Sequence, residues 1–184
     1  MTARRARLLL ACLLLPAGAQ ALAPDATYYP RRPGTRWVYS SGETQVAGAP
    51  VVHRGVTVTP VSHQYGATTF SQDLLEHRAD GSVWLRGVNT GGRLTWYTPP
   101  LNIYPPGPLR PGMTWQSAAA GVIQRSLVTG VAPLTTPAGA FNALKIRTET
   151  TAGGKVSAQT SYFVPTVGVV RFDTADGSVI QLVK

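Results

Sequence analysis

The three histidines are the side chains of this sequence best suited to binding a metal ion. His53 and His77 lie equally far from residue 65, so a hairpin turning there would place them opposite each other, with His63 near the turn. Such a pair could seed a copper or zinc site. Two observations argue against such a site. His77 would lie on the same strand face as the apolar Leu75, whereas His53 would point away from the apolar side. In addition, no H-x-H or H-E-x-x-H spacing occurs. We therefore interpret the histidines as structural and keep a copper or zinc site at His53, His63 and His77 as the alternative.

The sequence has no recognisable arrangement for nucleophilic catalysis. There is no G-x-S-x-G motif, and the only cysteine is Cys12. The eight acidic residues occur singly, and two of them, Asp80 and Asp176, belong to Asp-Gly turns. Strands can bring distant carboxylates together, but nothing in the spacing indicates such a pair. The sequence therefore favours a protein that is not an enzyme and that needs no cofactor.

Aromatic residues are numerous, with four tryptophans and seven tyrosines among 184 residues. Most are expected to fill the core or to begin strands. The stretch 96–106 is different, because its aromatic and aliphatic side chains accompany prolines that are incompatible with a regular strand. Such a patch could bind a sugar or an apolar ligand, or a partner protein of the cell envelope. Its candidate binding residues are Trp96, Tyr97, Leu101, Ile103 and Tyr104.

The proline-rich segment 98–112 separates two parts of the chain that share a pair of motifs. It holds six prolines, which predicts an extended, polyproline-like segment that joins two halves, 28–97 and 109–184, or covers a sheet edge. R-P-G-x-x-W begins at Arg32 and at Arg110, and A-D-G-S-V begins at Ala79 and at Ala175. Pro-Gly predicts a type II turn, after which each copy places a tryptophan at the start of a strand. The repetition indicates either an internal duplication or the same turn chemistry used twice.

Short apolar runs between Gly, Asn and Asp turns indicate an all-β protein with little helix. We expect a strongly curved antiparallel sheet, a half-barrel or open barrel of roughly 9–11 strands, with a loop at 40–50 and a strand at 51–61. Farther along, the apolar alternation predicts a three-residue loop centred on Gly153. That loop would pair Leu144 with Tyr162 and would turn Val156 and Ala158 towards the inner face.

The N-terminus has the features of a secretion signal. Three arginines and a short apolar run precede small residues, so we expect residues 1–21 to be a signal peptide and residues 22–184 to be a single β domain. Cys12 lies in the apolar run, and a lipobox at that position would instead give a lipid-anchored envelope lipoprotein. The formal charge of +9 falls to +6 when the three arginines, and no acid, are removed. Because the remaining positive charges are scattered, we expect no nucleic-acid partner and at most a peripheral attraction to a membrane or surface layer.

Three longer motifs resemble a family of uncharacterised exported bacterial proteins. Near the start of its mature part the chain has Y-x-P-x-x-x-G-x-x-W-x-Y at 28–39. It carries P-A-G-A-F-N-A-L-K-I at 137–146 and, near its end, Y-F-V-P-T-V-G-V-V-R at 162–171. The resemblance covers essentially the whole mature chain. It implies a curved antiparallel sheet similar to the half-barrel of periplasmic lipoprotein carriers, and it implies no catalytic residues.

Together these features favour a non-enzymatic exported protein of the periplasm, the cell envelope or the outer surface. It would bind a partner protein or an apolar or saccharide ligand through its concave face and the proline-rich segment, or support a surface assembly. A small envelope metal-binding or redox protein and a lipid-anchored lipoprotein are the two alternatives.

Overall fold

The computed structural model describes residues 27–184, so the predicted signal peptide and Cys12 lie outside the described residues. The described part is built of strands, and it contains no helix long and apolar enough to cross a membrane. The strands are β1 (Arg36–Val38), β2 (Glu43–Ala47), β3 (Val51–His53), β4 (Val56–Tyr65), β5 (Thr68–His77), β6 (Val83–Thr90), β7 (Arg93–Tyr104), β8 (Thr114–Ala119), β9 (Val122–Thr136), β10 (Gly139–Ala152), β11 (Lys155–Val164), β12 (Gly168–Asp173) and β13 (Val179–Gln181).

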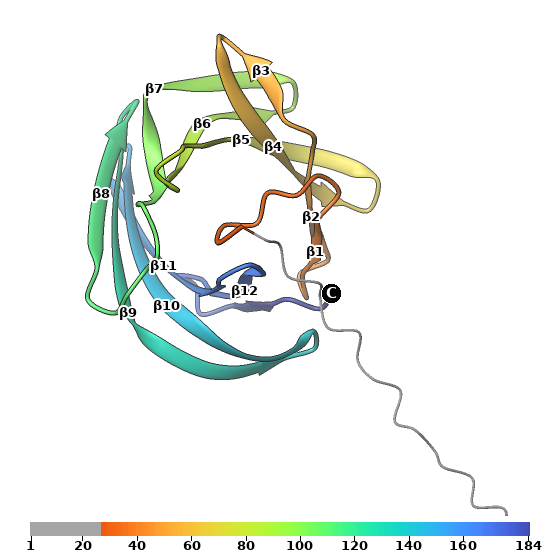
Figure 1. Ribbon diagram of the computed structural model, residues 1–184, viewed down its shortest axis with the longest axis vertical. Coiled ribbons are helices and arrows are strands. Elements are labelled where there is room, and N and C mark those ends of the chain that lie inside the picture. The colour runs from red at the N-terminus through yellow and green to blue at the C-terminus, as the bar shows by residue number, and fades with distance from the viewer. Residues whose placement is uncertain (1–26) are drawn as a thin grey trace, which may run out of the picture.

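The strands form two antiparallel sheets that follow each other in sequence. The first sheet has the order β1-β2-β4-β5-β6-β7, with β3 paired to β4, and the second has the order β13-β12-β11-β10-β9-β8. In Figure 1 the two sheets curve around a common centre, the first above and the second below. The predicted all-β class with curved antiparallel sheets is therefore confirmed.

Thirteen strands are present among residues 27–184, more than the predicted 9–11. The predicted loop at 40–50 contains β2, and the predicted strand at 51–61 is divided between β3 and β4. The division is a tight turn at Arg54 and Gly55, whose φ angles are 49° and 75°. The turn was not predicted because it lies within a valine-rich run and because an arginine in the left-handed region has no strong sequence signature.

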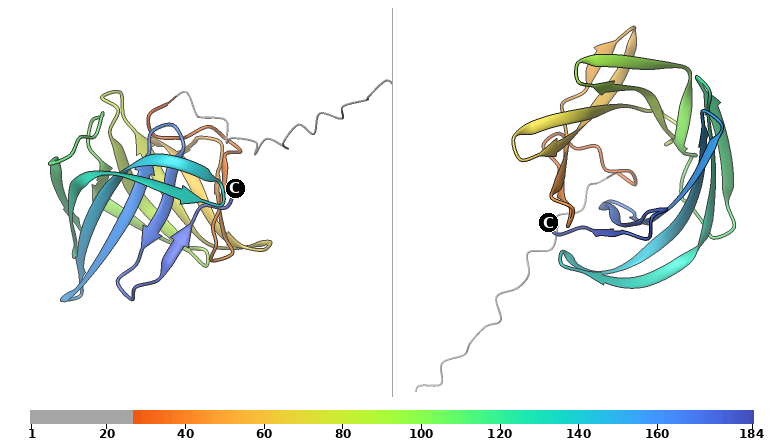
Figure 2. Two further views of the ribbon diagram at one scale, coloured as in Figure 1. Left: turned by 90° about the horizontal axis from the view of Figure 1, so that it is seen from below. Right: turned by 180° about the vertical axis from the view of Figure 1, so that it is seen from behind.

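Both ends of the two sheets lie close together. At one end, the C-terminal residues run beside β1: Tyr39 forms a bridge with Leu182, and the Val38 amide donates to the Lys184 carbonyl at 2.8 Å. At the other end, the Asn102 amide of β7 donates to the Ser117 hydroxyl of β8 at 3.0 Å. Two further views show the same curved arrangement from below and from behind (Figure 2).

The repeated motifs form the predicted turns. In both R-P-G-x-x-W copies the glycine has positive φ (83° at Gly34, 86° at Gly112), and the next amide donates to the arginine carbonyl at 3.0 and 3.1 Å. These are type II turns. In the two A-D-G-S-V copies, the aspartate oxygen accepts the serine amide at 2.9 Å in the first and 3.0 Å in the second, and the glycine again has positive φ. Equivalent local chemistry therefore gives equivalent turns in the two sheets.

The proline-rich segment does not begin where it was predicted to. Strand β7 continues through Pro99 and Pro100 to Tyr104. Between the pairs Gly87–Trp96 and Leu85–Leu101, four residues of β7 oppose one residue of β6. The prolines lie in this bulge, where a missing amide proton removes no ladder hydrogen bond.

The hairpin between β10 and β11 also differs from its prediction. Its loop is the two-residue Gly153-Gly154, with φ angles of 55° and 76°, so Leu144 pairs with Phe163 rather than Tyr162. Val156 is 69% exposed and therefore lies on the outer face. The predicted pairing was wrong because it assumed that the apolar side of β11 faces inwards.

Candidate functional site

A cavity of about 460 Å³ lies between the two sheets. Its walls are mainly aromatic and aliphatic, and they come from strands of both sheets and from the segment that precedes β1. A narrow group of polar side chains interrupts them on one side. The lining residues used below are Tyr29, Glu43, Gln45, His63, Asp73, Leu75, His77, Leu85, Ile103, Tyr104 and Phe163.

The segment before β1 lies inside the curve of the sheets and covers part of the cavity (Figure 1). The Tyr29 ring stacks on the Tyr104 ring, with centroids 4.6 Å apart, and packs against Phe163 at 5.5 Å. The Tyr29 hydroxyl donates to the Pro105 carbonyl at 3.2 Å, and the Tyr28 hydroxyl accepts the Leu109 amide at 3.0 Å. These aromatic contacts connect the N-terminal segment to both sheets.

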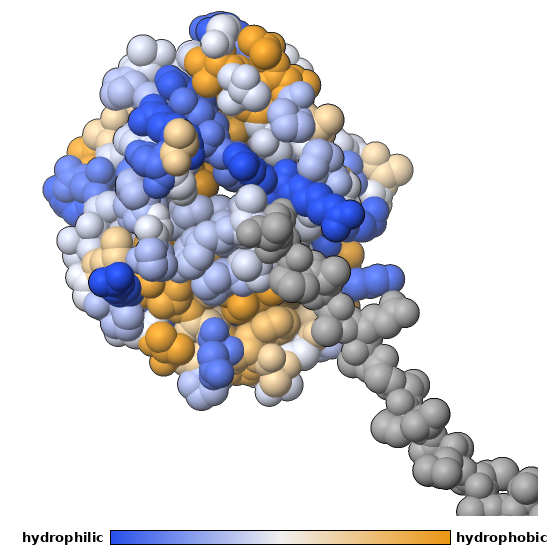
Figure 3. Space-filling view, viewed as in Figure 1, coloured by the Kyte–Doolittle hydropathy of each residue, from blue (hydrophilic) through white to orange (hydrophobic). Residues whose placement is uncertain are grey.

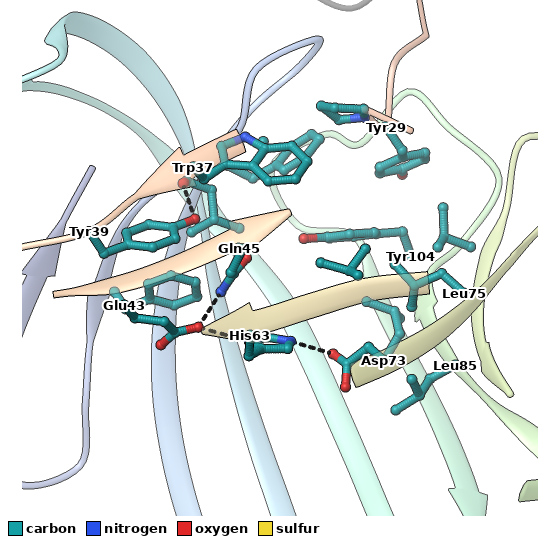
Figure 4. A pocket seen from close by; sticks show the side chains of 18 of the residues that line it. Tyr29, Trp37, Tyr39, Glu43, Gln45, His63, Asp73, Leu75, Leu85 and Tyr104 are labelled. Atoms are coloured by element: carbon teal, nitrogen blue, oxygen red, sulfur yellow. Dashed lines mark hydrogen bonds and ion pairs between the residues drawn. The ribbon is translucent and has the colours of Figure 1, made fainter. Parts of the chain in front are cut away.

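The polar side of the cavity is a carboxylate–imidazole–carboxylate arrangement (Figure 4). Glu43 on β2, His63 on β4 and Asp73 on β5 lie on three neighbouring strands of the first sheet. His63 Nδ1 lies 2.8 Å from Glu43 Oε1, and His63 Nε2 lies 3.3 Å from Asp73 Oδ2. The second contact is an ion pair whose geometry falls short of a hydrogen bond. Gln45 Nε2 also donates to Glu43 Oε1 at 3.0 Å.

This arrangement holds His63 in its charged form. Burial disfavours the imidazolium, but the hydrogen bond to Glu43 and charge attraction to both Asp73 and Glu43 outweigh burial and raise the pKa of His63 to about 9. In turn, the hydrogen bond from His63 lowers the pKa of Glu43. An imidazolium with a carboxylate at each nitrogen has no lone pair to accept a proton near neutral pH. The group is therefore suited to fixing strands and presenting charge rather than to acting as a general base.

The predicted ligand-binding residues are divided between different surroundings. Ile103 and Tyr104 line the cavity, and Leu101 is buried beside them in β7. Trp96 instead lies against His53, with ring centroids 5.0 Å apart, and under the Arg54 guanidinium at 5.7 Å.

The last of the predicted residues, Tyr97, belongs to the four-residue bulge of β7. The bulge therefore separates Trp96 from Leu101, Ile103 and Tyr104. The periodicity of the sequence does not reveal a bulge.

The predicted opposition of His53 and His77 is wrong. His53 belongs to β3 and pairs with Val56, whereas His77 pairs with Val83 of β6. Among residues 27–184, no three His, Cys, Asp or Glu side chains are grouped so that they could hold a metal ion. His63 and His77 both line the cavity, so two of the three histidines lie at the candidate site for a reason other than the predicted one.

Sequence reasoning missed Glu43 and Asp73. Glu43 lies in the stretch that was taken for a loop, and the alternation of Glu43, Thr44, Gln45 and Val46 is the signal that could have identified β2. Asp73 was treated as one of several isolated acids. Its proximity to His63 depends on the β4–β5 register, which shifts between His63 and Gln64.

No family model and no curated protein sequence matches this chain. Among solved structures, the chain is similar to a presumed exported protein with a YmcC-like fold from Bacteroides fragilis. The alignment covers 86% of this chain and 98% of that one, with a TM-score of 0.48 and 14% sequence identity. A likeness at this level transfers no function, and the resemblance to lipoprotein carriers remains an expectation from the sequence motifs.

Proposed function

We propose that this chain is an exported, non-enzymatic binding protein of the cell envelope that holds an apolar or amphiphilic ligand between its two sheets. The observation that supports it is the cavity of about 460 Å³ with mainly apolar walls. Small-molecule sites typically measure about 300–1,000 Å³ and combine apolar walls with a few polar groups. The signal-like N-terminus supports export.

The apolar walls would supply most of the binding free energy. Leu75, Leu85, Ile103 and Phe163 come from four different strands and meet around the same space. Each square ångström of apolar surface removed from water contributes about 25 cal/mol, so an aliphatic chain that touches these walls gains favourable free energy without any specific polar contact. The cavity is therefore suited to ligands with a flexible apolar part.

A titration with N-phenyl-1-naphthylamine, a dye that fluoresces in apolar surroundings, tests this proposal on the protein comprising residues 22–184. We expect saturable binding that Leu85→Trp weakens by about tenfold or more, because the indole would fill the space that Leu85 borders. Ile103→Trp serves as a second blocking variant on another strand.

The matched control is Val156→Trp, which adds the same indole at a position that is 69% exposed. Its affinity for the dye should equal that of the unaltered protein. Equal affinities for all of these proteins, or no saturable binding by the unaltered protein, would contradict the proposed function.

A further inference from the structure

A second cavity adjoins the first and has a different chemical character. Its volume is about 310 Å³, and the two cavities share Ile103, Tyr104, Gln159, Val169 and Phe172 among their lining residues. No charged residue lines it, whereas nine amide or aliphatic hydroxyl side chains do. These are Asn102, Gln124, Ser126, Thr148, Thr150, Ser157, Gln159, Ser161 and Thr174.

Strands β9 and β11 turn polar side chains towards this cavity and apolar neighbours outwards. On β11, Ser157, Gln159 and Ser161 line the cavity, while their neighbour Val156 is 69% exposed. On β9, the cavity-lining Ser126 is likewise followed by Leu127, which is 37% exposed. Figure 3 shows apolar surface gathered over the lower part of the molecule, where Figure 1 places β9 and β10. Burial of apolar surface favours the opposite arrangement, so the polar interior is a feature that core packing does not explain.

The polar groups of this cavity retain unused hydrogen-bonding capacity. The Ser126 and Thr148 hydroxyls bond to each other at 2.9 Å, which satisfies one bond of each. The Asn102 side-chain oxygen is buried and accepts no hydrogen bond from any residue of the described part. Buried polar groups in proteins are normally paired, so this oxygen is available to a hydrogen-bond donor of a bound molecule.

Uncharged donors and acceptors beside aromatic rings match a neutral, hydroxyl-rich group. Trp115 and Tyr104 line the cavity together with the amides and hydroxyls, and an aromatic face with such neighbours suits the alternating polar and apolar edges of a sugar. A charged group would lose its hydration there without meeting an opposite charge. A cation would instead meet opposite charges at the Glu43–His63–Asp73 arrangement, which lines the first cavity.

We propose that the ligand is an uncharged amphiphile whose apolar chain occupies the first cavity and whose hydroxyl-rich, sugar-like head occupies the second. This inference rests on the proposed function, because the chain of the ligand takes the apolar cavity. The two cavities adjoin at their five shared lining residues, so one molecule of this kind would extend from one cavity into the other. The ligand class is therefore that of an alkyl glycoside or a glycolipid.

Four probes with the same ten-carbon chain separate the inference from the proposal beneath it: decyl glucoside, decanol, decyl sulfate and decyltrimethylammonium. Calorimetric titration of the protein comprising residues 22–184, below the micelle concentrations, should show decyl glucoside binding about tenfold or more tightly than the two charged probes and severalfold more tightly than decanol. Equal affinities for all four heads overturn the inference but leave the proposed function intact. Tightest binding of decyltrimethylammonium overturns it as well, because the head then lies at Glu43 and Asp73. If none of the four binds, the proposed function itself fails.

Two variants that remove single hydroxyls locate the head. Thr150→Val and Ser161→Ala change residues of the second cavity alone, and each should weaken decyl glucoside by about three- to tenfold while leaving decanol unchanged. The control, Thr129→Val, removes an exposed hydroxyl of β9 and should change neither affinity. Unchanged affinity of decyl glucoside for both folded cavity variants would overturn the inference.

Discussion

His63 both carries a charge and joins side chains of three strands. Its imidazole lies between Glu43 and Asp73 and thereby joins the side chains of β2, β4 and β5 at the edge of the cavity. The three side chains carry a net charge of −1 when the imidazole is protonated and both carboxylates are ionised. The arrangement stabilises the strands only while the imidazole keeps its proton.

The pKa of His63 predicts a specific dependence of stability on pH. Because the folded pKa, about 9, lies above the ordinary value of 6.5, the stabilisation is fully present below pH 6.5 and is lost as the pH rises through 9. Relative to His63→Gln, the unaltered protein should lose on the order of 2 kcal/mol of unfolding free energy between pH 6 and pH 10. Urea unfolding at several pH values measures this difference. A difference that stays constant over that range would show that His63 is not held in its charged form.

Gly87 is required for the close approach of β6 and β7 beside the bulge. A Cβ atom at this position would lie 2.7 Å from the Thr95 carbonyl oxygen and 3.2 Å from the Trp96 ring. Backbone cannot yield easily, so Gly87→Ala should destabilise the protein by about 1–3 kcal/mol in chemical unfolding. Gly130 also lies beside a register shift, but a Cβ atom there would meet nothing within 4 Å, so Gly130→Ala should be nearly neutral. Similar effects of the two substitutions would contradict this account of the bulge.

At the scale of elements, the segment before β1 acts as part of the core. Tyr29 is buried, and its ring contacts Tyr104 of β7 and Phe163 of β11. Tyr29 therefore adds to the direct contact between the two sheets, in which the Tyr104 and Phe163 rings lie 5.2 Å apart. The segment was interpreted from sequence only as a lead-in to the first strand, because two adjacent tyrosines do not show which sheet they will contact.

Removal of the Tyr29 side chain tests the role of this segment. Tyr29→Ala should lower the unfolding free energy by about 3–5 kcal/mol, as for other large buried aromatic side chains. Tyr29→Phe keeps the ring and loses only the hydrogen bond to Pro105, so it should lower it by about 1 kcal/mol. The surface comparison is Tyr65→Ala, where the side chain is 51% exposed. Thermal unfolding would contradict this role if Tyr29→Ala and Tyr65→Ala had equal effects.

The turns and the all-β class could be predicted from the sequence, but the strand register could not. Pro-Gly and Asp-Gly fix local backbone angles, so both copies of each motif form the expected turns. The direction in which β11 faces depends instead on the Gly153-Gly154 loop and on the polar interior of the second sheet. Val156 shows the limit of the period-two pattern, which identifies the two faces of a strand but not which of them is buried.

At the scale of the whole molecule, the C-terminal residues hold the two sheets together. Leu182 is fully buried, and its amide donates to the Val170 carbonyl at 2.8 Å, while the Val183 amide donates to the Val38 carbonyl of β1 at 2.7 Å. The C-terminal residues thus contact both the first and the second sheet. The candidate site depends on this closure, because residues of β1, β2 and β12 line the same cavity.

This closure predicts that the two sheets unfold together. Leu182→Ala should destabilise the protein by about 2–5 kcal/mol, whereas Val183→Ala, at a side chain 39% exposed, should have an effect below about 1 kcal/mol. Both variants should unfold in one transition that is the same by tryptophan fluorescence and by circular dichroism. Two separate transitions for Leu182→Ala would mean that the sheets are independent.

The candidate site could be predicted from the sequence only in part, because its polar residues are brought together by the arrangement of the whole sheet. Ile103 and Tyr104 were identified because they stand out locally as apolar residues among prolines. Glu43, His63 and Asp73 are 30 residues apart at the extremes and meet only through the order and register of three strands. No local pattern specifies such a meeting, because register is decided by the packing of whole faces.

Methyl NMR on protein labelled at leucine, valine and isoleucine, titrated with decyl glucoside, tests most directly whether the cavity binds an apolar chain. We expect saturable shifts concentrated on the methyl groups of Leu75, Leu85 and Ile103, which line the first cavity from three strands. Methyl groups of the exposed Val52 and Val156 should not move. Shifts confined to these exposed valines, or no saturable shift at any methyl group, would contradict the central claim that the ligand lies between the two sheets.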